Sequence, residues 1–150
     1  MRALIQRVSK AHVAVNQDTV GNIDNGLCIF IGIMENDQPK DIEYIVDKIV
    51  NLRIFPNAEG KFDQSVIETK GELLIISQFT LYANTKKGRR PSFTRSAKPQ
   101  EAKFIFNETI NQFEATGLKI QTGLFQSHMN VSIVNDGPVT IFIDSRDHSI

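Results

Sequence analysis

The 150-residue chain has a single cysteine, Cys28, and no stretch that approaches the roughly 18 consecutive apolar residues of a membrane-spanning helix. One cysteine excludes an intramolecular disulfide and any Cys-x-x-Cys motif, and its neighbours Leu27 and Ile29 predict a buried core thiol. The apolar stretch between Arg2 and Arg7 is too short for a signal peptide. We therefore expect a soluble, cytoplasmic protein that has no membrane partner.

Net charge is also absent, because 17 basic residues balance 17 acidic ones. The charges are nevertheless unevenly placed: residues 86–103 hold seven cations and one anion, Glu101, which gives this segment a net charge of +6. The cations are Lys86, Lys87, Arg89, Arg90, Arg95, Lys98 and Lys103. A basic segment on an otherwise acidic chain can direct a polyanion to one face. Gly88 and Pro91 predict that residues 86–93 form a loop rather than the charged face of a helix. The alternative is that these charges belong to a loop that is merely solvated.

The common hydrolase and metal motifs are missing as well: there is no Gly-x-Ser-x-Gly, no His-Glu-x-x-His and no Walker sequence. The three histidines, His12, His128 and His148, lie far apart without the spacing of metal ligands, so the sequence predicts no metal site. A triad that pairs Ser77 or Thr80 with His128 stays open, since triad members meet in space rather than in sequence.

The chain has 41% hydrophobic residues and no linker-like segment, which predicts one domain over residues 1–150. Alternation in residues 11–15 and the turn-rich residues 21–26 indicate an antiparallel meander that continues into a strand at 27–33. Further strands are expected on either side of a turn within residues 53–62 and at residues 73–76, 118–122, 129–134 and 139–143. With two helices, this set favours an α+β domain whose antiparallel-rich sheet curls toward a barrel.

Two helices are expected between these strands. The first has Asp37 as N-cap and Pro39 in its first turn, and it ends near Leu52. Its apolar stripe is Ile42, Ile45, Val46, Ile49 and Val50. The second begins near Pro99 and ends before Gly117. Its apolar side carries Ala102, Phe106, Ile110 and Phe113, and its cap is Lys98 or Ser96.

The run Leu73-Leu74-Ile75-Ile76 ends abruptly in Ser77-Gln78-Phe79-Thr80. Four consecutive aliphatic residues indicate a strand buried on both faces, so the polar residues should emerge at the margin of the sheet. Such margins are where sites form, although these side chains could simply satisfy backbone groups at the strand end.

A second unusual segment, Asn135-Asp136-Gly137-Pro138, separates the apolar runs 131–134 and 139–143. Proline cannot donate to a sheet, so a turn or an irregular connection between two strands is expected, with two backbone carbonyls displayed. An X-Pro bond is where a cis peptide is easily adopted, and we expect Gly137-Pro138 to be cis. An ordinary Asn-Asp-Gly hairpin turn is the alternative.

Together, Ser77-Gln78-Phe79-Thr80-Leu81 and Asn135-Asp136-Gly137-Pro138-Val139-Thr140 resemble the two signature motifs of the D-aminoacyl-tRNA deacylase (D-tyrosyl-tRNA deacylase) family. Further matches over the whole chain are Ala3-Leu4-Ile5-Gln6-Arg7-Val8, Arg53-Ile54-Phe55, Arg90-Pro91-Ser92-Phe93 and Gln121-Thr122-Gly123. Gln126-Ser127-His128 departs from the small residues usual there, which affects the shape of one pocket wall.

The resemblance implies a half-closed barrel with two helices, assembled as a homodimer with the active site at the subunit interface. It implies a cytoplasmic carboxylic ester hydrolase that frees D-amino acids, and glycine, from tRNA as a proofreading step in translation, without a cofactor. The runner-up functions are a relaxed-chirality relative that clears L-alanine from mischarged tRNA and a non-catalytic nucleic-acid-binding module.

The resemblance also implies roles for individual residues. Phe79 and Thr80, mainly through their backbone, with Ser77 and Gln78 would form the catalytic site. Gly137 and Pro138 would form a chiral filter in the partner's pocket, supported by Arg7 and Met129. Lys86, Lys87, Arg89, Arg90 and Arg95 would bind tRNA. Phe79 could stack on the terminal adenosine or belong to the core, and Arg7 could instead be a surface cation.

Overall fold

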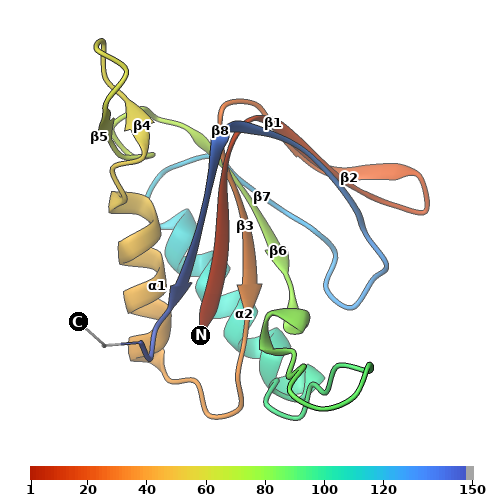
Figure 1. The fold of residues 1–150 in the computed structure, drawn as a ribbon. Helices are drawn as coiled ribbons and strands as arrows, with labels where there is room; N and C mark the ends of the chain where they lie inside the picture. Colours follow the sequence, from red (N-terminus) through yellow and green to blue (C-terminus); the bar gives the residue numbers. More distant parts are fainter. Residues whose placement is uncertain (148–150) are drawn as a thin grey trace.

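The computed structural model describes residues 1–147, so His148 lies outside the described residues. The described part contains eight strands, two α-helices and one 3-10 helix (Figure 1). In chain order they are β1 (Arg2–Val15), β2 (Asp18–Ile23), β3 (Gly26–Gly32), α1 (Pro39–Asn51), β4 (Phe55–Pro56), β5 (Phe62–Gln64), β6 (Glu72–Ser77), η1 (Phe79–Tyr82), α2 (Pro99–Glu114), β7 (Ile120–Thr122) and β8 (Asn130–Asp144).

The long strand β1 organises the main sheet. It pairs antiparallel with β2, β3 and β8, while β6 and β7 join beyond β3 in parallel. The two ends of the strand order β2-β1-β3-β6-β7 approach each other, since a Cβ added to Gly21 in β2 would lie 2.9 Å from the carbonyl oxygen of Thr122 in β7. The predicted α+β class, with two helices and a sheet nearly closed into a barrel, is confirmed.

The sheet has an apolar core on each face. Both helices pack on one face (Figure 1), where Ile5, Ile29 and Ile75 belong to the same buried cluster as the stripe of α1. The opposite face encloses a second cluster, which contains Leu74 and Cys28. Cys28 is fully buried, and burial raises the pKa of its thiol to about 12. The predicted core thiol is confirmed.

Helix α1 confirms the predicted apolar stripe, but the predicted N-cap is wrong. The helix is capped by Gln38, whose backbone amide donates to Asp41 Oδ2 at 2.8 Å. Asp37 is buried instead, and it accepts hydrogen bonds from the α-amino group of Met1 and from Arg146, both at 2.9 Å. Both partners are distant in sequence, so the local pattern around Asp37 could not indicate them.

Helix α2 begins at Pro99 as predicted. Its N-cap, Lys98, makes no side-chain capping bond, and the alternative cap, Ser96, donates its hydroxyl to the carbonyl oxygen of Phe79. The buried side chains of the helix are Ile105, Phe106, Thr109 and Phe113, whereas Ala102 and Ile110 are only partly buried. No helix within residues 1–147 is long and apolar enough to cross a membrane.

Strand β8 corrects the expectation of two strands joined by a turn. Both of its halves pair antiparallel with the same strand, β1, so the chain does not reverse at Gly137. Gln6 pairs with Thr140 and Val8 with Asn135, which are two positions apart on β1 but five apart on β8. The intervening residues therefore form a bulge within one strand, which we call the Gly137-Pro138 bulge.

Candidate functional site

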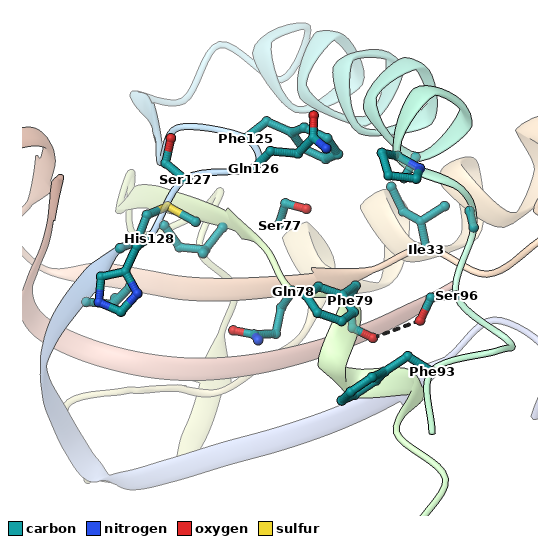
Figure 2. Close-up of a pocket in the computed structure, with 16 residues that line it drawn as sticks. Ile33, Ser77, Gln78, Phe79, Phe93, Ser96, Phe125, Gln126, Ser127 and His128 are labelled. Carbon is teal, nitrogen blue, oxygen red and sulfur yellow. Dashed lines mark hydrogen bonds between the residues drawn. The ribbon is translucent and has the colours of Figure 1, made fainter. Parts of the chain in front are cut away.

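The main cavity lies at the carboxyl end of β6, between the sheet and the start of α2 (Figure 2). Its volume is about 660 Å³, within the range of small-molecule sites. It is lined by Ile33, Ile76, Ser77, Gln78, Phe79, Phe93, Ser96, Ala97, Pro99, Ala102, Phe125, Gln126, Ser127, His128, Met129 and Val131. The polar residues that were predicted to emerge at the end of β6 thus lie at this cavity.

The backbone of β3 fixes the chain where it leaves β6. The amide of Gln78 donates to the carbonyl oxygen of Ile31 at 2.7 Å, and η1 begins at the next residue. Gly32 allows this approach, because a Cβ there would lie 2.9 Å from Leu81 Cβ. The Gln78 side chain donates to Thr80 Oγ1, and Thr80 itself is exposed and does not line the cavity. Ser77, Gln78 and Phe79 do line it.

Phe79 is not a core residue, because 56% of its surface is exposed. Its ring meets that of Phe93 edge to face, with centroids 5.0 Å apart and an interplanar angle of 70°. Ser96 holds the backbone here by donating to the Phe79 carbonyl oxygen at 3.1 Å (Figure 2). The two rings form an accessible aromatic wall, which suits a planar base.

The backbone amides of Phe79 and Thr80 open the 3-10 helix η1. The first amides of such a helix have no acceptor inside it, so they remain available as donors. They lie directly after Ser77 and Gln78 at the cavity margin. This arrangement can present hydrogen-bond donors to an oxyanion without using a side chain.

The segment Gln126-Ser127-His128 also lines the cavity. This confirms the expectation that the segment forms one of the pocket walls. Gln126 has a left-handed backbone with φ of 61°. Met129 follows it and packs against Gly123, where a Cβ would lie 2.5 Å from Met129 Sδ. Met129 was predicted to support the filter, and the structure places it in this wall. The sequence did not indicate that Ile33, Pro99 and Ala102 would complete the cavity.

No Ser-His pair is assembled in the described part of the chain. Figure 2 places Ser77 and His128 on separate parts of the cavity wall, and no hydrogen bond joins His128 to Ser77 or Thr80 among residues 1–147. His12 lies on β1, paired with Asn22 and Ser132. Among the same residues, no group of three or more His, Cys, Asp or Glu side chains gathers as metal ligands.

The Gly137-Pro138 bulge lies on the surface, outside the lining of the chain's own cavity. The peptide bond is cis, as the sequence predicts, and Gly137 has a φ of 119°. Asn135 ties the bulge to β1 when its side-chain amide is oriented so that both of its polar atoms have partners: the amide nitrogen then donates to the carbonyl oxygens of Arg7 and Val139 at 3.0 and 3.1 Å. A single chain therefore does not bring the bulge and the cavity together.

Arg7 lies beneath the bulge and is buried, with 7% of its surface exposed, so the surface-cation interpretation is wrong. Its Nη1 donates to the Ile54 carbonyl oxygen at 2.6 Å. Its Nε lies 2.9 Å from Asp136 Oδ2, although without the alignment of a hydrogen bond. A Cβ added to Gly137 would lie 3.2 Å from Arg7 Nη2. Arg7 thus links β1 to Ile54, which lies just before β4, and to the bulge.

The chain directly after η1 forms what we call the basic loop, whose cations run from Lys86 to Arg95. An isolated bridge between Asn84 and Ser92 closes it, and Lys86, Lys87, Arg89 and Arg90 are all exposed. No salt bridge within residues 1–147 involves any of these four cations. Arg95 is exposed and lies 3.9 Å from Met34 Sδ. Their charge is therefore available beside the cavity.

Comparison with known proteins gives a consistent result. The family model described as "D-Tyr-tRNA(Tyr) deacylase" matches residues 4–144. The chain is 52% identical to the D-aminoacyl-tRNA deacylase of Aquifex aeolicus over 98% of this chain and 99% of that protein. It is 51% identical to the protein of the same name from Thermosipho africanus, over 97% and 98% of the two chains.

Two solved structures share the fold. One, described as "c-Myc DNA Unwinding Element Binding Protein", has a TM-score of 0.91 and 38% identity and covers 96% of this chain and 98% of its own. The other, described as a "probable eukaryotic D-amino acid tRNA deacylase", has a TM-score of 0.81 and 16% identity, with coverage of 95% and 97%. From its motifs, its fold and these matches, the chain belongs to the D-Tyr-tRNA(Tyr) deacylase family.

Proposed function

We propose that this protein is a D-aminoacyl-tRNA deacylase, a hydrolase that cleaves the ester between a D-amino acid and tRNA. The observation that carries the proposal is the cavity at the end of β6, which Ser77, Gln78 and Phe79 line in a chain 52% identical to a D-aminoacyl-tRNA deacylase. Its volume of about 660 Å³ suits an aminoacyl group with the terminal nucleoside.

The tRNA would approach along the basic loop. Its exposed cations, with Arg95, would hold phosphates, while the half-exposed ring of Phe79 stacks on the terminal adenine. Base stacking on an aromatic side chain contributes about 1–3 kcal/mol. Phosphate contacts position the substrate without reading its sequence, so many tRNA species would be accepted.

Hydrolysis would need little side-chain chemistry. An aminoacyl ester is already activated, so a positioned water and stabilisation of the oxyanion suffice. The amides of Phe79 and Thr80 at the start of η1 are suitable donors for that oxyanion. The 2′-hydroxyl of the adenosine would assist the attack.

Chirality would be read by the Gly137-Pro138 bulge of a second subunit. The bulge is exposed and is contacted from its own chain by Asn135 and Arg7, so in a homodimer it would be free to enter the partner's cavity. Rigid backbone carbonyls beside the substrate Cα would collide with an L side chain and bind the α-amine of the D form. Glycine has no Cβ, so glycyl-tRNA would also be hydrolysed.

The test is deacylation of matched D- and L-tyrosyl-tRNA by the purified protein. We expect rapid hydrolysis of the D form, with D-aspartyl-tRNA similarly cleaved and both L forms intact, because the filter reads only the direction of Cβ. Comparable hydrolysis of D and L forms would contradict the proposal and favour the relaxed-chirality relative that clears L-alanyl-tRNA.

A non-catalytic nucleic-acid-binding function is the second candidate. It is favoured by the basic loop and by the 38% identical relative whose name describes binding to a DNA unwinding element. Turnover distinguishes the two functions: a binding module would retain tRNA or DNA in a mobility-shift assay but release no amino acid from any aminoacyl-tRNA.

A further inference from the structure

The β4–β5 hairpin, residues 55–64, stands apart from the main sheet as its own two-stranded sheet (Figure 1). Its root is fixed in the core, where Phe55 is 8% exposed. Arg53 and Asp63 form an ion pair across its base, and Asn57 Oδ1 accepts from the amides of Glu59 and Lys61 at its tip. A short, well-fixed hairpin with no part in the cavity needs another explanation.

Phe62 in β5 is an unusual residue for its position, because 58% of its surface is exposed although it is large and apolar. Its ring lies beside the guanidinium of Arg7, with Arg7 Cζ 5.6 Å from the ring centroid. That distance is within the range of a cation–π contact. The carbonyl of Ile54, just before β4, accepts from the same guanidinium. The hairpin therefore contacts Arg7 through the Phe62 ring, and the residue at its root contacts Arg7 through the Ile54 carbonyl.

Arg7 needs these contacts, because its ion pair with Asp136 alone does not fix it. The Nε–H is not aligned with the carboxylate, and the side chain of Asp136 is 54% exposed. A freely rotating guanidinium would leave the space beside Gly137 undefined, where Nη2 would be 3.2 Å from an added Cβ. The hairpin and its root thus supply two contacts to the guanidinium that lies beside Gly137.

We propose that the β4–β5 hairpin is a brace for the Gly137-Pro138 bulge and that Phe62 is a positioning residue, which acts on stereoselectivity through Arg7. The role rests on the proposed function, since selectivity between D and L substrates is its consequence. It gives the Arg53-Ile54-Phe55 motif a purpose: the motif ties the hairpin to the core and presents the Ile54 carbonyl to Arg7.

The experiment compares Phe62→Leu with Phe62→Tyr, because leucine keeps apolar volume but removes the aromatic face. Phe62→Leu should lower the ratio of kcat/KM for D- over L-tyrosyl-tRNA by roughly 2- to 5-fold, the scale of one cation–π contact at an exposed site. Phe62→Tyr should keep the wild-type ratio. Phe142→Leu is the matched control. Phe142 lies on β8, the strand that contains the bulge, and is 52% exposed. The centroid of its ring lies 5.7 Å from Arg2 Cζ, so it makes a similar contact with a different arginine.

A second measurement does not depend on activity. The ¹⁵N order parameters of the Gly137 and Val139 amides should fall from about 0.85 toward 0.6 in Phe62→Leu and stay unchanged in Phe62→Tyr and Phe142→Leu. Unchanged order parameters, or an equal loss of D and L hydrolysis in Phe62→Leu, would overturn the brace. A wild-type protein without D preference would contradict the proposed function, while the order parameters would still test the brace.

Discussion

Replacing Gly137 with alanine should destabilise the protein more than the same replacement at a glycine whose added Cβ would meet open space. At a φ of 119° an L-residue is strained, and such backbone strain amounts to about 1–3 kcal/mol. The new Cβ would also lie 2.8 Å from Val139 Cγ2 and 3.0 Å from the Val139 amide nitrogen. Overpacking of this kind adds about 1–3 kcal/mol, although partial relaxation makes the two effects overlap. We expect the free energy of unfolding to fall by about 2–4 kcal/mol.

Gly60→Ala provides the matched control, because Gly60 has a φ of 77° and no atom within 4 Å of its added Cβ. It should lose only the left-handed strain, about 1–2 kcal/mol. Both variants would be unfolded in urea at one protein concentration, since the stability of the proposed homodimer would depend on concentration. Deacylation of D-tyrosyl-tRNA, measured well below the unfolding transition, should fall more than about tenfold in Gly137→Ala alone. Equal destabilisation of the two variants, with activity retained, would refute the reasoning.

Three further predictions follow from the site and the fold. Ser77→Ala and Thr80→Ala should each keep activity within about tenfold of wild type, and a loss above about 10³-fold in either would indicate a side-chain nucleophile or base. Alanine at both Arg89 and Arg90 should weaken binding of different tRNAs similarly and flatten the salt dependence by about 0.7–0.9 in slope per lost contact, whereas unchanged affinity at low salt would make them a solvated loop. Burial raises the pKa of Asp144, but hydrogen bonds from Arg2 and the Arg146 amide and the charge of Arg2 outweigh it, so the pKa is lowered overall. Its contribution to stability is therefore full above the unfolded pKa of about 3.9 and lost as the pH falls through the folded value. Urea unfolding below about pH 4 should show a steeper loss in wild type than in Asp144→Asn, and parallel pH profiles would contradict this.

The parts of the fold predicted from sequence are those that local periodicity determines. The stripe of α1, the start of α2 at Pro99 and the buried strand before Ser77 all depend on neighbours within a few turns or positions. The position of the cavity followed from the same local logic, because polar residues that end a buried strand must emerge at its margin.

The errors come from contacts between distant residues. Asp37 resembled an N-cap, but its carboxylate binds the Met1 amino group, which lies 36 positions away in sequence. Gly137-Pro138 resembled a turn, but the pairing of both halves of β8 with β1 determines that the strand continues. The Arg7 contact with Ile54 spans 47 positions, so no local pattern could place that cation in the interior.

Since the only thiol of this chain, Cys28, is fully buried and its pKa is about 12, it should be almost wholly unreactive toward maleimides at neutral pH. A cysteine introduced at an exposed position such as Lys87 or Asp136 would then be the only thiol to be labelled, without first removing a native one. Fluorophores or spin labels at these two positions would report separately on the arrival of tRNA and, in the proposed homodimer, on the distance between the two bulges.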